Sequence, residues 1–109
     1  MPSSKLLHLA DQNFDKAVTN GVVLVDLWAP WCAPCMMQGP ILEEVADAIG
    51  DRAKIAKLNV DEGQMIAARF GVQAIPTLLI LKNGAEVQRF VGVQGRETLV
   101  SAIEDTLKA

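Results

Sequence analysis

The run from Val22 to Trp28 constrains the fold more than any other part of the chain. It is apolar at every position except Asp26. A strand with one face in water alternates apolar and polar residues, so this run predicts a central strand that is covered on both faces. Because side chains alternate along a strand, Asp26 shares a face with Leu24 and Trp28, which predicts a carboxylate inside the protein. A strand of this kind is typical of an α/β sheet with helices on both sides.

Periodicity and turn residues predict the elements on either side of this strand. The predicted strands are 6–9, 22–28, 53–60, 77–81 and 87–91. The predicted helices are 11–20, 32–49, 64–70 and 96–108. Asp11 is the expected N-cap of the first helix, and Pro40 is expected to kink the second.

The order of these elements predicts the topology. A helix separates 22–28 from 53–60, so these two strands should run parallel. The Asn83-Gly84 pair between the last two strands indicates a hairpin, whose strands are antiparallel. The sequence therefore predicts an α/β fold with a central mixed five-stranded sheet flanked by four helices.

Length and composition limit what such a chain can do. Its 109 residues suit a single domain, 1–109, and 50% are hydrophobic, so folding requires no disulfide scaffold. The net charge is -3 and the basic residues are scattered, which argues against nucleic-acid binding. The apolar stretches are only strand-length, and the segment Met1–Leu7 lacks the features of a secretory signal. We therefore expect a monomeric cytoplasmic protein that does not enter the membrane.

The two cysteines of the chain, Cys32 and Cys35, stand at the predicted strand-to-helix junction. A helix N-terminus presents unpaired N–H groups and a partial positive charge, which favour a thiolate over a thiol. The spacing places the two sulfurs on one helical turn, where they can bridge each other. In a reducing compartment, a lone pair of this kind is typical of thiol–disulfide chemistry.

Two other interpretations of the cysteine pair are weaker. A passive disulfide would close too short a loop to stabilise the fold much. A structural zinc site needs four protein ligands, and the one further candidate, His8, is distant in the sequence. We therefore expect no metal site.

Six pieces of the sequence, in order, resemble the thioredoxin family, and they span essentially the whole chain. They are Asp26 before Trp28-Ala29, Trp31-Cys32-x-Pro34-Cys35, Pro40, Lys57 in Lys57-Leu58-Asn59-Val60-Asp61, Ile75-Pro76-Thr77, and Lys82-Asn83-Gly84 followed by Gly92. The resemblance implies the thioredoxin fold and the reduction of disulfides in protein substrates. The chain departs from the family pattern at Ala33, where glycine is usual, and at Met36, where lysine is common. These two departures leave the redox potential open.

Roles follow for the residues near the cysteines. Cys32 is expected to be the more exposed sulfur and to attack the substrate disulfide, after which Cys35 resolves the mixed disulfide. Burial should raise the pKa of Asp26 into the range of a general base for Cys35, and the resemblance implies that Lys57 tunes that carboxylate. The alternative for Asp26 and Lys57 is a buried ion pair or a solvated strand end.

The resemblance also implies how substrates dock. It implies that the Ile75-Pro76 bond is cis and faces the cysteines, and that Pro34 and Pro76 belong to the catalytic site. From the sequence alone, an ordinary trans proline would be favoured. A flat, uncharged docking surface around Cys32 is expected from Trp31, Ala33, Pro34, Ile75, Gly92 and Val93. Met36 and Met37 are expected to belong to the core or its rim rather than to recognise substrates.

The electron source is expected to be another protein. The sequence has no nucleotide-binding signature, so we expect no bound cofactor and electron delivery by dithiol exchange. The resemblance implies a thioredoxin reductase, drawing on NADPH or ferredoxin, and disulfide-containing proteins as partners.

Two alternative functions stay open. One is an oxidant or isomerase of an exported compartment, and the other is a binding module in which the cysteines are incidental.

Overall fold

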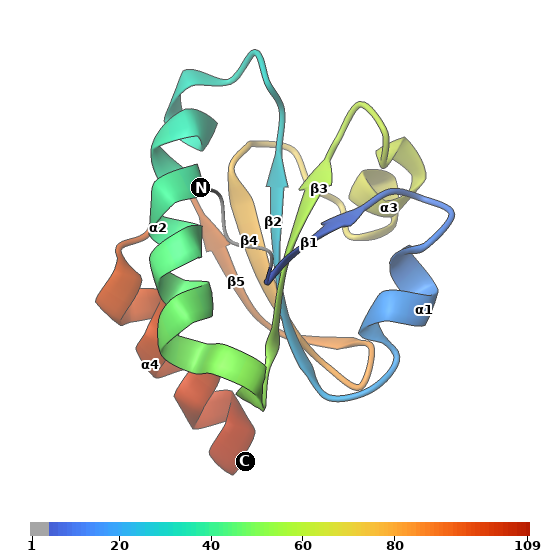
Figure 1. Ribbon diagram of the computed structural model, residues 1–109. Helices are drawn as coiled ribbons and strands as arrows, with labels where there is room; N and C mark the ends of the chain where they lie inside the picture. Colours follow the sequence, from blue (N-terminus) through green and yellow to red (C-terminus); the bar gives the residue numbers. More distant parts are fainter. Residues whose placement is uncertain (1–4) are drawn as a thin grey trace.

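The computed structural model describes residues 5–109 and contains a five-stranded sheet (Figure 1). The strands are β1 (Leu6–Leu9), β2 (Val22–Trp28), β3 (Lys54–Asn59), β4 (Thr77–Lys82) and β5 (Ala85–Val91). In space they follow the order β1-β3-β2-β4-β5, so β2 is central. β3 runs parallel to β1 and β2, whereas β4 runs antiparallel to β2 and β5. The predicted mixed sheet is confirmed. The first four residues of the N-terminal segment considered above lie outside the described residues.

Helices cover both faces of this sheet. In the described part of the chain they are α1 (Phe14–Val18), α2 (Ala33–Ile49), α3 (Gln64–Arg69) and α4 (Arg96–Lys108), with a 3₁₀ turn, η1 (Gly50–Arg52), after α2. Figure 1 shows α2 and α4 on one face of the sheet and α1 and α3 on the other. This arrangement confirms the expected four flanking helices.

The two faces of β2 belong to two different apolar cores. Leu24 packs in the core beneath α2 and α4, together with Leu42 and Ile103. Val25 packs in the opposite core, together with Phe14 of α1. Every residue of 22–27 is buried, as predicted for a strand covered on both sides. Each large apolar side chain buried in this way contributes about 1.5–3 kcal/mol.

Helix α1 differs from the prediction, because Asp11 is not its N-cap. The helix starts at Phe14 and is shorter than expected. The Asp11 carboxylate instead accepts hydrogen bonds from the backbone N–H groups of Met65 (3.2 Å) and Ile66 (3.0 Å). The N-cap position of α3 is Gly63, which has no side chain to cap the helix. Asp11 therefore caps α3 from a distant part of the chain.

The remaining boundaries differ from the predicted ones by at most two residues. Helix α2 runs through Pro40 without a break, and the expected kink stays a prediction. Positive φ angles at Asn83 (51°) and Gly84 (87°) confirm the tight hairpin between β4 and β5.

Candidate redox site

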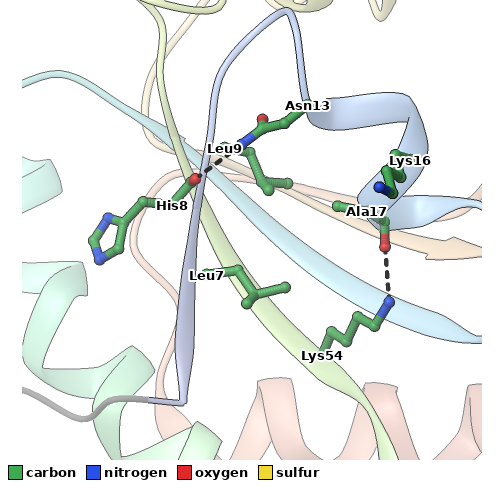
Figure 2. A pocket seen from close by; sticks show the side chains of 7 residues that line it. All are labelled: Leu7, His8, Leu9, Asn13, Lys16, Ala17 and Lys54. Carbon is green, nitrogen blue, oxygen red and sulfur yellow. Dashed lines mark hydrogen bonds between the residues drawn. The ribbon is translucent and has the colours of Figure 1, made fainter.

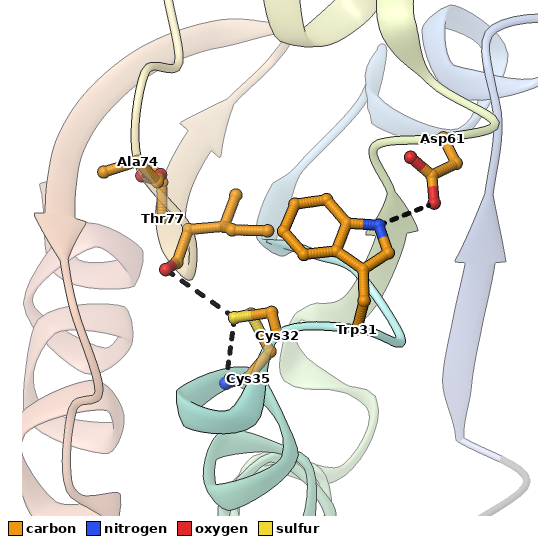
Figure 3. Close-up of a disulfide and its surroundings, with 7 residues drawn as sticks. Trp31, Cys32, Cys35, Asp61, Ala74 and Thr77 are labelled. Atoms are coloured by element: carbon orange, nitrogen blue, oxygen red, sulfur yellow. Dashed lines mark hydrogen bonds between the residues drawn. A yellow bond between two sulfur atoms is a disulfide. The ribbon is translucent and has the colours of Figure 1, made fainter.

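The cysteines form a disulfide at the N-terminus of α2, just beyond the end of β2 (Figure 3). Their Cα atoms are 5.3 Å apart. Cys32 is the N-cap of α2, with an extended backbone, and its Sγ accepts a hydrogen bond from the N–H of Cys35 at 3.3 Å. Pro34 lies in the first turn, where a residue without an N–H costs the helix nothing. The helix terminus therefore directs a backbone donor at the sulfur of Cys32.

The two cysteine residues differ in access to solvent. Cys32 is 7% exposed and Cys35 is 2% exposed, which confirms that Cys32 is the more accessible of the two. Both residues are nonetheless buried in the oxidised form. On its other side, Cys32 Sγ lies 3.7 Å from the carbonyl oxygen of Ile75. Only the reduced thiol has a proton to donate to that oxygen.

The segment before β4 faces the disulfide. Figure 3 shows Ala74 on this segment and Thr77 at the start of β4, across the site from Trp31. The Ile75-Pro76 peptide bond is cis, as the family resemblance implied. The hydroxyl of Thr77 donates to the Ala74 carbonyl at 2.6 Å and closes the turn around this bond.

Asp26 lies inside the protein, on the face of β2 that carries Leu24. Its side chain is fully buried, and neither carboxylate oxygen has a hydrogen-bond partner among residues 5–109. Burial raises the pKa of Asp26 from its usual 3.8 to about 7, and the positive charge of Lys57 partly opposes that rise. The carboxylate therefore changes charge close to neutral pH.

Lys57 stands directly opposite Asp26 in the register of β2 and β3. Its ammonium nitrogen lies over the ring of Trp28, 4.1 Å from the ring centroid. This is a cation–π contact that holds the ammonium group at the end of the strand. The full burial of Asp26 excludes a solvated strand end.

An apolar surface surrounds the sulfurs. Trp31 is 68% exposed, and its indole N–H donates to Asp61 Oδ2 at 3.1 Å, which holds the ring beside the site (Figure 3). Ala33, Pro34 and Val93 are exposed, whereas Ile75 and Gly92 are partly buried. The residues expected to form a docking surface are therefore accessible to differing degrees.

Met36 and Met37 do not lie in the core, which leaves the rim position of the two expected ones. Met36 is 46% exposed and Met37 is 66% exposed. Both lie in the first two turns of α2, whose buried side is occupied by Cys35, Gln38 and Leu42. The apolar surface beside the disulfide is thus larger than the sequence suggested.

His8 lies away from the disulfide. It is exposed on β1 and lines a separate shallow pocket of about 400 Å³ with Leu7, Leu9, Asn13, Lys16, Ala17 and Lys54 (Figure 2). Within residues 5–109, no group of three His, Cys, Asp or Glu side chains is arranged to hold a metal ion. None of the helices in the described part of the chain is long and apolar enough to cross a membrane.

Comparison with known proteins decides the family. The model of the family described as thioredoxin matches residues 5–105. The chain belongs to the thioredoxin family. It is 45% identical over 102 residues to a Bacillus subtilis protein named thioredoxin, a match that covers 94% of this chain and 98% of that one. A thioredoxin of Haemophilus influenzae is 44% identical over 102 residues, with 92% and 95% covered. "Thioredoxin 2" of Chlorobaculum tepidum is 43% identical over 105 residues, with 94% and 96% covered.

Family membership and the bonded Cys32–Cys35 pair together establish a thiol–disulfide oxidoreductase. In thioredoxins the reactive group is a pair of protein thiols, and the exchange step needs no prosthetic group. The thiol–disulfide chemistry predicted from the Cys-x-x-Cys pattern at a strand-to-helix junction is therefore confirmed.

Sequence reasoning missed three contacts around this thioredoxin site. They are the Trp31–Asp61 bond, the Thr77–Ala74 bond, and two hydrogen bonds between the Gln38 side chain and the backbone of Gln94. For Gln38 a signal was present, since a polar residue three positions after Cys35 falls on the buried side of the helix. The Trp31–Asp61 contact joins residues that are distant in the sequence, and no local pattern indicates their proximity.

Proposed function

We propose that this chain is a single thioredoxin domain over 1–109 that reduces disulfides in a range of protein substrates. The observation that carries the proposal is the position of Cys32 Sγ, which receives the backbone N–H of Cys35 at the start of α2. A donor aimed at the sulfur stabilises negative charge there, so it favours the thiolate that attacks disulfides. The apolar surface beside it suits transient contact with many partners.

The reaction proceeds by two exchanges. The Cys32 thiolate attacks one sulfur of a substrate disulfide, which forms a mixed disulfide and releases the other substrate sulfur as a thiolate that takes a proton from water. The thiolate of Cys35 then attacks Cys32 Sγ, which forms the intramolecular disulfide and releases the second substrate sulfur. The substrate gains two electrons and the protein loses two. Because Cys35 is held one helical turn away, the second step is fast.

Asp26 is the proposed general base for the second exchange. Its pKa of about 7 means that it is partly ionised at neutral pH and able to accept the proton of the Cys35 thiol. Lys57 keeps that pKa from rising further, because its positive charge favours the carboxylate. Both residues thus act on proton transfer rather than on substrate binding.

The substrate is proposed to lie across Trp31, Ala33, Ile75, Gly92 and Val93. These residues are accessible around the sulfurs, and the Ile75 carbonyl already faces Cys32 Sγ at 3.7 Å. Pro34 and Pro76 are proposed to shape the two backbones that face each other across the sulfurs.

The oxidised form is proposed to be regenerated by a thioredoxin reductase that draws on NADPH or ferredoxin. The electrons would pass to the Cys32–Cys35 disulfide by dithiol exchange, without a cofactor bound to this chain. We propose a cytoplasmic location, since an electron-donating dithiol is kept reduced in that compartment. We also propose a monomeric state. Cell fractionation and sedimentation of the reduced protein test these two statements.

Insulin reduction and the equilibrium potential test the function. The reduced protein should reduce insulin disulfides, and its potential against glutathione should lie well below about −180 mV, the value of an isomerase. The Cys35→Ser variant should accumulate mixed disulfides through Cys32. A potential near that of an oxidant, or full biological activity of a Cys32→Ser/Cys35→Ser variant, would contradict the proposal.

A further inference from the structure

Gln38 is a buried polar residue that the reaction does not use. It lies on α2, one turn after Cys35 and on the same side of the helix, and its side chain is fully buried. Its amide nitrogen donates to the carbonyl oxygen of Gln94 at 3.0 Å, and its amide oxygen accepts from the backbone N–H of Gln94 at 2.8 Å. One side chain therefore satisfies both backbone groups of a single loop residue.

The loop that Gln38 holds is part of the proposed docking surface. Gln94 lies between β5 and α4, and Figure 1 shows α4 beginning beside α2. The side chain of Gln94 donates to the carbonyl of Gly92 at 3.3 Å. The N–H of Gly92 in turn donates to the carbonyl of Pro76 at 2.8 Å. A continuous series of hydrogen bonds thus joins α2, the 92–94 loop and the segment next to Ile75.

We propose that Gln38 is a positioning residue that holds the 92–94 loop against α2, so that this loop and Ile75 form a preformed groove for an extended segment of the substrate protein. This inference rests on the proposed reductase function. A groove that is already ordered binds its peptide without the entropy loss of ordering a loose loop. Gln38 should therefore affect binding of protein substrates, while the exchange chemistry at Cys32 depends on other contacts.

The two hydrogen bonds need a side chain with a donor and an acceptor at this reach. Leucine fills a similar space but would leave the N–H and C=O of Gln94 without these partners, which favours a loop that opens to water. Glutamate keeps the shape and the acceptor but, when ionised, loses the donor to the Gln94 carbonyl. Gln38→Leu therefore removes both hydrogen bonds to Gln94, whereas Gln38→Glu removes one of them.

The test compares two substrates in Gln38→Leu and the wild type. Insulin needs the groove, whereas a small aromatic disulfide such as dithiobis(nitrobenzoate) reaches the sulfur without it. We expect KM for insulin to rise about tenfold in Gln38→Leu, with kcat, the rate with the small disulfide and the redox potential unchanged. Hydrogen exchange at the Gln94 amide should accelerate in the same variant. Gln12→Leu, which makes the same change at an exposed site, is the matched control and should behave as wild type.

The remaining outcomes would contradict either the positioning role of Gln38 or the reductase function. An unchanged KM for insulin, unchanged protection of the Gln94 amide, or an equal loss with both substrates would overturn the positioning role. Should Gln38→Leu fail to fold, Gln38→Glu keeps the shape of the side chain and should give an intermediate KM; an unchanged KM there would equally overturn it. A wild type that does not reduce insulin would instead overturn the reductase function, and the groove with it.

Discussion

Asp26 and Lys57 lie opposite each other on β2 and β3, and the Asp26 carboxylate is fully buried without a hydrogen-bond partner in the described part of the chain. Burial of this kind disfavours the ionised form. The protein thus keeps a carboxylate whose charge destabilises the fold, in a strand that ends at the redox site.

The first prediction is that Asp26→Asn stabilises the protein in a pH-dependent way. The pKa of Asp26 is about 7 in the folded state and 3.8 in its usual environment, so the folded state holds this proton more tightly than the unfolded state. The stabilisation that results from the tighter protonation of Asp26 in the folded state is fully present below about pH 4 and is lost as the pH rises through 7. Asparagine resembles the protonated acid and does not ionise. Urea unfolding of the oxidised proteins should therefore show similar stabilities near pH 4, and a gain in the variant of up to roughly 4 kcal/mol at pH 8. A gain that does not depend on pH would contradict this origin.

The second prediction concerns the rate of the second exchange. Asp26→Asn should slow resolution of the mixed disulfide at pH 7 by at least about tenfold, because Cys35 loses its proton acceptor. Lys57→Met should shift the inflection of the pH–rate profile to higher pH, since the Lys57 charge lowers the pKa of Asp26. Stopped-flow fluorescence between pH 5 and 9 follows both variants, with the exposed Lys16→Met as control. Identical profiles in Asp26→Asn and wild type would remove Asp26 from the mechanism.

The third prediction concerns the cap that Asp11 supplies to α3. Asp11→Ala removes the acceptor for the N–H groups of Met65 and Ile66, and should lower the free energy of unfolding by about 1 kcal/mol. Asp11→Asn retains an acceptor and should lose less. Denaturant unfolding gives the magnitude, and faster hydrogen exchange at Ile66 would locate the effect in α3. Slower exchange there, or an equal loss in the exposed Gln12→Ala, would show that the cap is not the cause.

The fourth prediction compares two glycine-to-alanine changes that should alter the stability of the protein in opposite directions. A Cβ on Gly63 would lie 2.5 Å from Cδ1 and 2.7 Å from Cγ of Leu58, which is fully buried and cannot move without disturbing its core. Gly63→Ala should therefore cost about 1–3 kcal/mol. Gly39 lies inside α2, where a Cβ would be 3.9 Å from Lys57 Nζ, an ordinary contact. Gly39→Ala should stabilise by about 0.5–1 kcal/mol, since alanine favours the helix. Thermal unfolding of the two variants side by side measures the loss of stability in Gly63→Ala and the gain in Gly39→Ala.

Much of the fold could be predicted from local patterns. The run 22–28, apolar except at Asp26, predicted a central strand, and the helical periodicity of 96–108 matched α4 at both ends. The buried position of Asp26 followed from strand alternation alone. The cis bond before Pro76 came from family resemblance, because the sequence itself favoured trans. The roles assigned to the site residues, including Asp26 and Lys57, stay predictions until they are measured.

The sequence by itself determined which elements form and which face of each is buried, because periodicity is a property of consecutive residues. Only the tertiary structure decided which distant groups meet. Asp11 caps α3 rather than α1, and Gln38 binds the backbone of Gln94 across two elements. Each of these outcomes depends on how helices and loops pack on the sheet, and no local pattern carries the position of a partner that lies tens of residues away.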